Sequence, residues 1–116
     1  MSEKRILFLQ RAHPHDARAR ESLDAALVAA IFEQSVTVLF RDEGVLQLSA
    51  EHSPSGGDLS ALIESLPEYG VRSVFACQHS LSRWGLEPDS LLLPVSVIGI
   101  EEQSALIAGQ HAVVND

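Results

Sequence analysis

Residues 5–10 read Arg-Ile-Leu-Phe-Leu-Gln, a stretch in which four apolar side chains follow one another without a break. A strand with one face in water alternates apolar and polar residues, whereas a strand covered on both faces reads as a continuous apolar run. We therefore expect residues 5–10 to form a buried strand inside a largely parallel sheet, and this expectation decides the fold class.

The rest of the chain alternates between helical and strand patterns. Residues 17–32 are predicted to form a helix capped by Asp16, because apolar residues recur there at helical spacing, namely Leu23, Ala26, Leu27, Ala30 and Ile31. Further strands are predicted over residues 36–40, 71–76, 95–98 and 112–114, and further helices over residues 58–66, 80–84 and 101–108. Right-handed crossovers then give an α/β fold with a doubly wound, mainly parallel five-stranded sheet in a single domain spanning residues 1–116. Gly44 is expected to supply a positive φ to the turn after the second strand.

Composition limits the classes of partner. The 116-residue chain holds 8 Lys and Arg against 16 Asp and Glu, giving a net charge of −8. A surface that binds nucleic acid needs clustered basic residues, so we expect no direct contact with nucleic acid. The first apolar run is too short for a signal peptide or a membrane span, and the single cysteine, Cys77, excludes an internal disulfide. A cytoplasmic protein is expected.

Cys77 and His79 are the candidate catalytic residues. Loops at the carboxyl ends of parallel strands meet at one edge of a sheet, and Cys77 lies where the third predicted strand ends and a helical turn begins. The amino end of a helix lowers the pKa of a thiol, and His79 is near enough in sequence to assist. The residues alone leave two interpretations open, a reactive thiol or a small buried hydrophobe. We expect solvent to reach Cys77 at least in part; full enclosure away from any cleft at the strand ends would rule out a chemical role.

Other patterns at the same edge carry less information. His13 and His15 could begin a metal site, but no further ligands are identifiable, and an exposed loop explains them as well. Asp42 and Glu43 could act as an acid–base pair, although adjacent acids before a glycine are usually a solvated turn. Neither a Walker loop nor a G-x-G-x-x-G stretch is present, so no cofactor and no metal are expected.

Four stretches together resemble the DsrE/DsrF-like sulfur-relay family, and most closely its TusC (DsrF) type of subunit. They are the Pro14-His15 loop, residues 20–25 in the first helix, the stretch Glu-Gly-Val-Leu-Gln-Leu at residues 43–48, and Ser80-Leu81 with Gly85-Leu86. The stretch at residues 43–48 resembles the signature D-G-V-x-Q-L. The chain departs from the family pattern at Asp16, where glycine is usual, at Glu43, which replaces an aspartate, and at Trp84, which replaces an arginine.

The resemblance implies a three-layer α/β sandwich that assembles with TusB-like and TusD-like sister subunits into an α2β2γ2 heterohexamer. Such a complex passes persulfide sulfur through a further protein sulfur carrier towards 2-thiouridine at the tRNA wobble position. The related DsrEFH complex takes part in sulfur oxidation. Cys77 matches the sulfur-bearing cysteine of the family, a role that the family assigns chiefly to the TusD/DsrE type of subunit.

We therefore predict a non-catalytic or accessory subunit of a sulfurtransferase complex, with Cys77 as a secondary persulfide site. Three alternatives stay open. The chain is a free-standing thiol enzyme with Cys77 as nucleophile and His79 as base, a scaffold whose cysteine only fills the core, or a DsrF-like subunit in sulfur oxidation.

Overall fold

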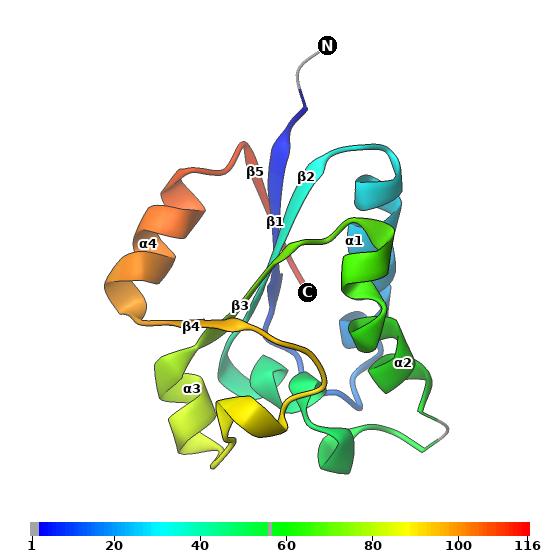
Figure 1. The fold of residues 1–116 in the computed structure, drawn as a ribbon, viewed down its shortest axis with the longest axis vertical. Helices are drawn as coiled ribbons and strands as arrows, with labels where there is room; N and C mark the ends of the chain where they lie inside the picture. The colour runs from blue at the N-terminus through cyan, green and yellow to red at the C-terminus, as the bar shows by residue number, and fades with distance from the viewer. Residues whose placement is uncertain (1–2, 56) are drawn as a thin grey trace.

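Five parallel strands form one sheet in the order β4-β3-β2-β1-β5 (Figure 1). The computed structural model describes residues 3–55 and 57–116. The strands are β1 (Arg5–Gln10), β2 (Ser35–Phe40), β3 (Ser73–Cys77), β4 (Ser96–Ile98) and β5 (Ala112–Asn115). Ile6 of β1 is in register with Val36 of β2 on one side and with Ala112 of β5 on the other. The predicted α/β fold with a parallel five-stranded sheet is confirmed.

Helices cover both faces of the sheet. On one face lie α1 (Ala17–Ile31), α2 (Asp58–Glu64) and the short 3-10 helix η3 (Leu66–Tyr69), and on the other lies α4 (Ile100–Ala108) (Figure 1). The short helix α3 (Gln78–Arg83) follows β3 at the carboxyl edge of the sheet. This arrangement is the expected three-layer sandwich. Within the described part of the chain, no helix is both long and apolar enough to cross a membrane.

The two faces of the sheet carry cores of unequal size. Alternate strand residues such as Phe8, Val38 and Phe40 point towards α1 and α2 and belong to the larger core. The smaller core lies under α4 and consists of Leu7, Leu9, Leu39 and Ile98, with the partly buried Phe75, Leu106 and Ile107 against it. Residues 7, 9, 39, 75 and 98 therefore define the α4 face, and the strand alternation continues from them to the carboxyl ends of the strands.

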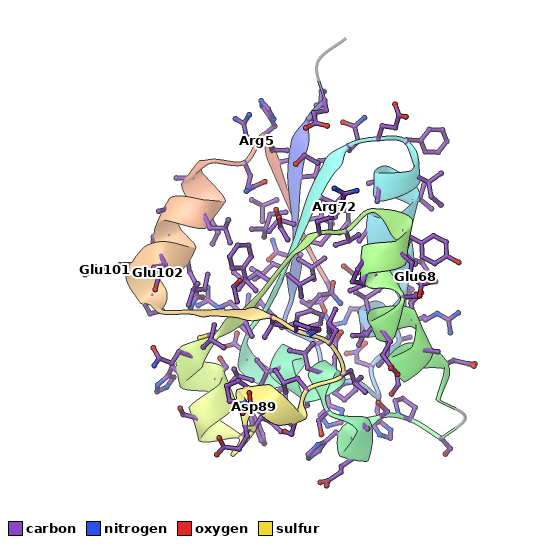
Figure 2. All side chains as sticks on the ribbon, viewed as in Figure 1. Arg5, Glu68, Arg72, Asp89, Glu101 and Glu102 are labelled. Atoms are coloured by element: carbon purple, nitrogen blue, oxygen red, sulfur yellow. The ribbon has the colours of Figure 1, made fainter. Side chains whose placement is uncertain are left out.

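The first helix begins as predicted at Asp16. Its carboxylate accepts a hydrogen bond from the backbone N–H of Arg18 at 2.9 Å, and the Arg18 guanidinium donates to the same carboxylate at 2.7 Å. These bonds lower the pKa of Asp16 to about 2. At the amino end of the sheet, Arg5 lies beside the turn between α4 and β5, where its Nε donates to the carbonyl of Gly109 at 2.7 Å (Figure 2).

The turn after β2 differs from the prediction. Gly44 has no positive φ; the residue with φ in the left-handed region is Asp42, at 53°. Gly44 is needed for a different reason, because a Cβ atom there would overlap the carbonyl oxygen of Gln10. Asp42 and Gly44 both belong to the 3-10 helix η1 (Asp42–Leu48), which contacts the end of β1 at Gln10.

Two buried glutamines hold η1 to the loop after β1. Gln10 Nε2 donates to Gln47 Oε1 at 3.1 Å, and Gln47 Nε2 donates to the carbonyl of Ala12 at 2.8 Å. Both glutamines are 0% exposed. Because water cannot replace these bonds, they fix the path of the loop between β1 and α1 relative to the end of β2.

Candidate functional site

Cys77 is the last residue of β3 and immediately precedes α3. The strand ends one residue later than predicted, and the helix begins at Gln78 rather than at Ser80. The predicted placement of Cys77 between a strand and a helical turn is therefore confirmed. Cys77 is in register with Ile98, the last residue of β4.

The thiol is buried but stabilised as a thiolate. Cys77 is only 4% exposed, so the expectation that solvent reaches its side chain is wrong for this chain taken alone. Burial raises the pKa of the thiol, but hydrogen bonds from the Ser80 hydroxyl and backbone N–H, from the Gln103 side chain and from the His79 backbone N–H outweigh it. The pKa of Cys77 consequently lies below its usual value.

Ser80 links the thiol to the end of β2. Its hydroxyl oxygen accepts a hydrogen bond from the backbone N–H of Asp42 at 2.9 Å. The oxygen is thereby occupied as an acceptor, which leaves the hydroxyl hydrogen for the sulfur of Cys77. Ser80 is 4% exposed, so this two-bond bridge is shielded from water.

His79 approaches Cys77 through its backbone and not through its ring. The residue is exposed, and it lines a hollow of about 420 Å³ together with Asp42, Glu43, Ser80, Arg83 and Trp84. Among the hydrogen bonds of residues 3–55 and 57–116, none joins the His79 ring to the thiol. Assistance by the His79 imidazole stays a prediction.

Asp42 and Glu43, the two acidic residues that follow β2, are among the residues that line this hollow. Asp42 Oδ2 accepts from Arg11 Nε at 2.9 Å, and both side chains of the pair are about half exposed. An ion pair this exposed contributes little to stability. Glu43 and Asp42 also line a neighbouring hollow of about 340 Å³ beside Arg11 and Arg18.

The two histidines of the first loop contact each other. Their ring centroids lie 5.3 Å apart, and the backbone N–H of His15 donates to Nδ1 of His13 at 3.1 Å. In the part of the chain that the structure describes, no group of three or more His, Cys, Asp or Glu side chains is placed to hold a metal ion.

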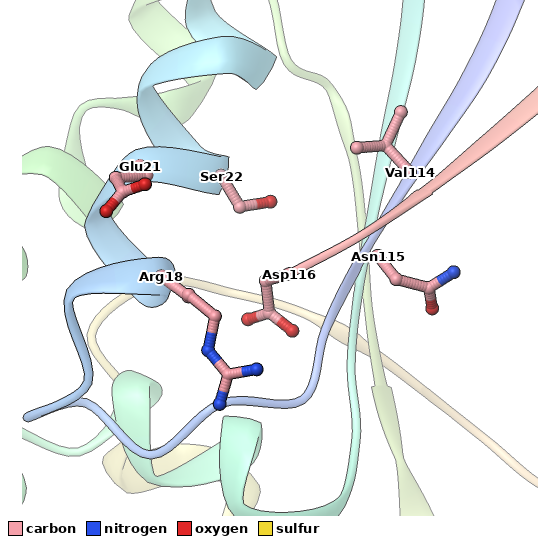
Figure 3. A pocket seen from close by; sticks show the side chains of 6 residues that line it. All are labelled: Arg18, Glu21, Ser22, Val114, Asn115 and Asp116. Atoms are coloured by element: carbon pink, nitrogen blue, oxygen red, sulfur yellow. The ribbon is translucent and has the colours of Figure 1, made fainter.

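A third hollow, of about 290 Å³, lies between α1 and the end of β5 (Figure 3). Arg18 and Ser22 reach it from the helix, and Asp116 reaches it from the end of the chain. The Asp116 carboxylate accepts from the backbone N–H groups of Arg11 and Ala12, at 2.8 and 3.1 Å. The Asp116 carboxylate therefore attaches the end of β5 to the loop that follows β1.

Sequence reasoning missed Gln103 as a neighbour of the thiol. Gln103 is 2% exposed on the side of α4 that faces the sheet, where Leu106 and Ile107 also lie. The sequence signal that could have identified Gln103 is a polar residue at helical spacing from the apolar residues Leu106 and Ile107. Arg41 directly follows Phe40, which is in register with Ala76, the residue before Cys77.

Comparison with known proteins assigns the family. The DsrE/DsrF-like family model matches residues 4–115. The chain belongs to the DsrE/DsrF-like family. A TusC homolog of Vibrio parahaemolyticus is 32% identical over 101 residues, covering 84% of this chain and 86% of the relative. A TusC homolog of Pseudomonas aeruginosa is 35% identical, covering 80% of this chain and 82% of the relative.

A further relative carries the other name used for this family. The intracellular sulfur oxidation protein DsrF of Allochromatium vinosum is 36% identical over 98 residues, covering 79% of this chain and 72% of the relative. Residues 43–48 form the segment in which Gly44 packs against Gln10 and Gln47 bonds to the first loop.

Solved structures show the same fold. The YchN protein of E. coli superposes with a TM-score of 0.80 at 16% identity, covering 97% of this chain and 99% of that one. The protein MTH1491 of Methanobacterium thermoautotrophicum, described as of unknown function, gives a TM-score of 0.74 at 21% identity, covering 98% of this chain and 100% of that one. These likenesses establish a DsrE-like fold.

Proposed function

We propose that this DsrE/DsrF-like chain is a TusC-like subunit of a sulfur-relay complex that supports persulfide transfer towards 2-thiouridine at the tRNA wobble position. The observation that carries the proposal is the match to TusC homologs at 32–35% identity over at least 80% of this chain. The acidic net charge of −8 agrees with a subunit that passes sulfur to a protein and leaves the tRNA to another component.

The chain acts as an accessory subunit. A free-standing thiol enzyme presents its nucleophile to the substrate, whereas Cys77 is 4% exposed and has no bond to the His79 ring among the described residues. We propose TusB-like and TusD-like sisters in an α2β2γ2 assembly and a separate protein carrier downstream, in the cytoplasm. Large apolar side chains that remain exposed support an assembly, among them Val28, Ile31 and Phe32 near the end of α1 and Tyr69 in η3.

Cys77 serves as a secondary persulfide site. The thiolate attacks the outer sulfur of a donor persulfide, a bond forms between Sγ and that sulfur, and the donor leaves as a thiolate after its S–S bond breaks. The hydrogen bonds that lower the pKa of the thiol favour this step, and burial limits it to a donor that reaches the strand end within the complex.

The first test is an affinity purification of the tagged chain from its native cytosol, with partners identified by mass spectrometry and stoichiometry by light scattering. Recovery of two small α/β sisters in equal amounts supports the proposal. Recovery of the chain alone at every salt concentration overturns it. Cys77→Ser then measures the role of the thiol: loss of all 2-thiouridine would indicate a catalytic thiol, whereas a partial or absent loss indicates an accessory one.

A DsrF-like role in sulfur oxidation is the second candidate function, and the relative from Allochromatium vinosum supports it. Deletion of the gene distinguishes the two. Loss of 2-thiouridine from tRNA supports the TusC-like role, and loss of sulfur oxidation with normal tRNA supports the DsrF-like role.

A further inference from the structure

Arg41 directly follows β2, and Cys77 is the last residue of the neighbouring strand β3. Phe40 of β2 is in register with Ala76 of β3, so Arg41 and Cys77 are the residues that come next on the two chains. The backbone of Arg41 is extended, with φ −148° and ψ 170°, so its side chain follows that of Leu39 onto the α4 face. The side chain of Cys77 follows Phe75 onto the same face.

Arg41 carries a buried donor without a partner. Its Nε is buried and makes no hydrogen bond to any described residue, although the residue as a whole is half-buried. By contrast, Arg11 at the end of β1 is paired with Asp42. An unpaired polar group costs free energy when it is removed from water, so a cation in this position calls for an acceptor.

Gln103 brings a second incomplete polar group to the same place. Its Nε2 donates to the carbonyl of Ile98 at 3.3 Å, and its side chain also lies within hydrogen-bonding reach of Cys77. Its Oε1 is buried and unpartnered among residues 3–55 and 57–116. A residue that is 2% exposed and incompletely bonded indicates that a further polar atom belongs beside the thiol.

We propose that Arg41 and Gln103 form a cradle for an anionic sulfur at Cys77, in which the Arg41 guanidinium neutralises the thiolate and the terminal sulfur of the persulfide. Arg41 is thus a positioning residue. The part that concerns the persulfide rests on the proposed function; the part that concerns the thiolate does not. After transfer, Cys77–S–SH loses its proton to solvent, and the Arg41 N–H donors meet the resulting Cys77–S–S⁻, while the Gln103 Oε1 accepts a hydrogen bond from the guanidinium.

Other charged groups near this edge are already engaged or face outward. The Asp42 carboxylate is held by Arg11, and the Glu102 carboxylate accepts from the Gly99 N–H at 3.2 Å. Glu43, His79 and Arg83 line the hollow in front of α3. Arg41 is the cation that the strand register places next to the sulfur.

The first experiment titrates the thiolate of the full chain by its ultraviolet absorbance. Cys77 is the single cysteine, so the same titration of Cys77→Ser supplies the baseline. We expect Arg41→Gln to raise the pKa of Cys77 by about 1 pH unit, because an opposite charge within hydrogen-bonding range is lost. Arg41→Lys keeps the charge and restores most of the shift. An unchanged pKa in Arg41→Gln, as expected if only a water molecule joins Arg41 to Gln103, overturns the cradle.

Arg72→Gln is the matched control. It makes the same change of charge just before the opposite end of β3 (Figure 2), about 16 Å along the strand and beyond the Debye length at physiological salt. We expect no shift of the Cys77 pKa in this variant. If Arg72→Gln shifts the Cys77 pKa as much as Arg41→Gln does, the shift reflects only the change in net charge. That result would also overturn the cradle. Far-ultraviolet circular dichroism of each variant checks that the fold is kept.

The second experiment loads the protein with an inorganic polysulfide and follows the added sulfur atom by mass spectrometry. If the wild type gains one sulfur and Arg41→Gln loses it at least several-fold faster, with rescue by Arg41→Lys, the cradle is supported. If both retain it equally, the cradle fails for the persulfide while Cys77 remains a sulfur acceptor. If the wild type gains no sulfur, the proposed role of Cys77 fails, and the titration alone decides the role of Arg41.

Discussion

Gly44 lies so close to Gln10 that its missing side chain is a requirement of the fold: a Cβ atom at position 44 would overlap the Gln10 carbonyl oxygen. The same carbonyl accepts a hydrogen bond from the Arg41 N–H at 3.1 Å. The end of β1 and the start of η1 therefore meet at one atom, the Gln10 carbonyl oxygen.

Substitution of Gly44 by alanine is expected to lower the free energy of unfolding by about 3 kcal/mol or more, because the clash is with backbone that cannot rotate away. Urea unfolding measures the change. Gly109→Ala is the control, since a Cβ atom there meets its nearest neighbours at an ordinary 3.6 Å. Equal stability of the two variants would show that the contact at Gln10 relaxes easily.

Gln47→Leu should lower the free energy of unfolding by about 2 kcal/mol, because it leaves the Ala12 carbonyl buried without its donor and removes one of the two acceptors of the Gln10 amide. Gln34→Leu provides the comparison. Gln34 accepts from the Lys4 N–H in an exposed position, where water replaces the bond, so its loss should cost under about 0.5 kcal/mol. If Gln47→Leu lowers the free energy of unfolding no more than Gln34→Leu does, the buried glutamine pair does not stabilise the fold.

Asp16 makes a contribution to stability that depends on pH. Its pKa in the folded chain is about 2, below the ordinary value of 3.8, so the charged form stabilises the fold above pH 4 and this stabilisation is lost as the pH falls towards 2. The difference in Tm between the wild type and Asp16→Asn, which keeps the capping acceptor but cannot ionise, should shrink over that interval. A difference that stays constant between pH 5 and pH 2 would contradict the ion pair with Arg18.

Ser80→Ala should raise the pKa of the Cys77 thiol, because a hydrogen bond that stabilises the thiolate is removed. Thiolate absorbance against pH measures the shift. Ser82→Ala changes an exposed serine of the same helix and should leave the pKa unchanged. If both variants behave alike, the hydroxyl of Ser80 does not reach the sulfur.

Local patterns predicted the strands of this fold well. The run of apolar residues at 6–9 marked the bounds of β1 correctly, and Asp16 marked the start of α1. The predicted helix over residues 58–66 instead divides into α2 and η3. Pro67 explains the division, since it has no N–H to donate to a preceding turn and restricts the residue before it. The 3-10 helix η1 had no local signal.

Of the candidate site, the sequence predicted only the position of Cys77 at the end of β3. The position of Cys77 followed from the end of an apolar run and the start of a polar one. Its burial did not, because Gln103 and Ser80 cover the sulfur from α4 and α3, and the packing of those helices depends on the whole sheet. Arg41 comes next to Cys77 only through the register of β2 and β3, which no local pattern specifies.

The position of β5 beside β1 also has a consequence for synthesis of the chain. β5 is the last of the five described strands to leave the ribosome, yet it pairs with the first of them. A nascent chain can pair β1 with β2 and add β3 and β4, but the outer N–H and C=O groups of β1 stay open until residue 115 has emerged. Open strand edges invite pairing with other chains, so the interval before β5 emerges is when this chain most needs a chaperone.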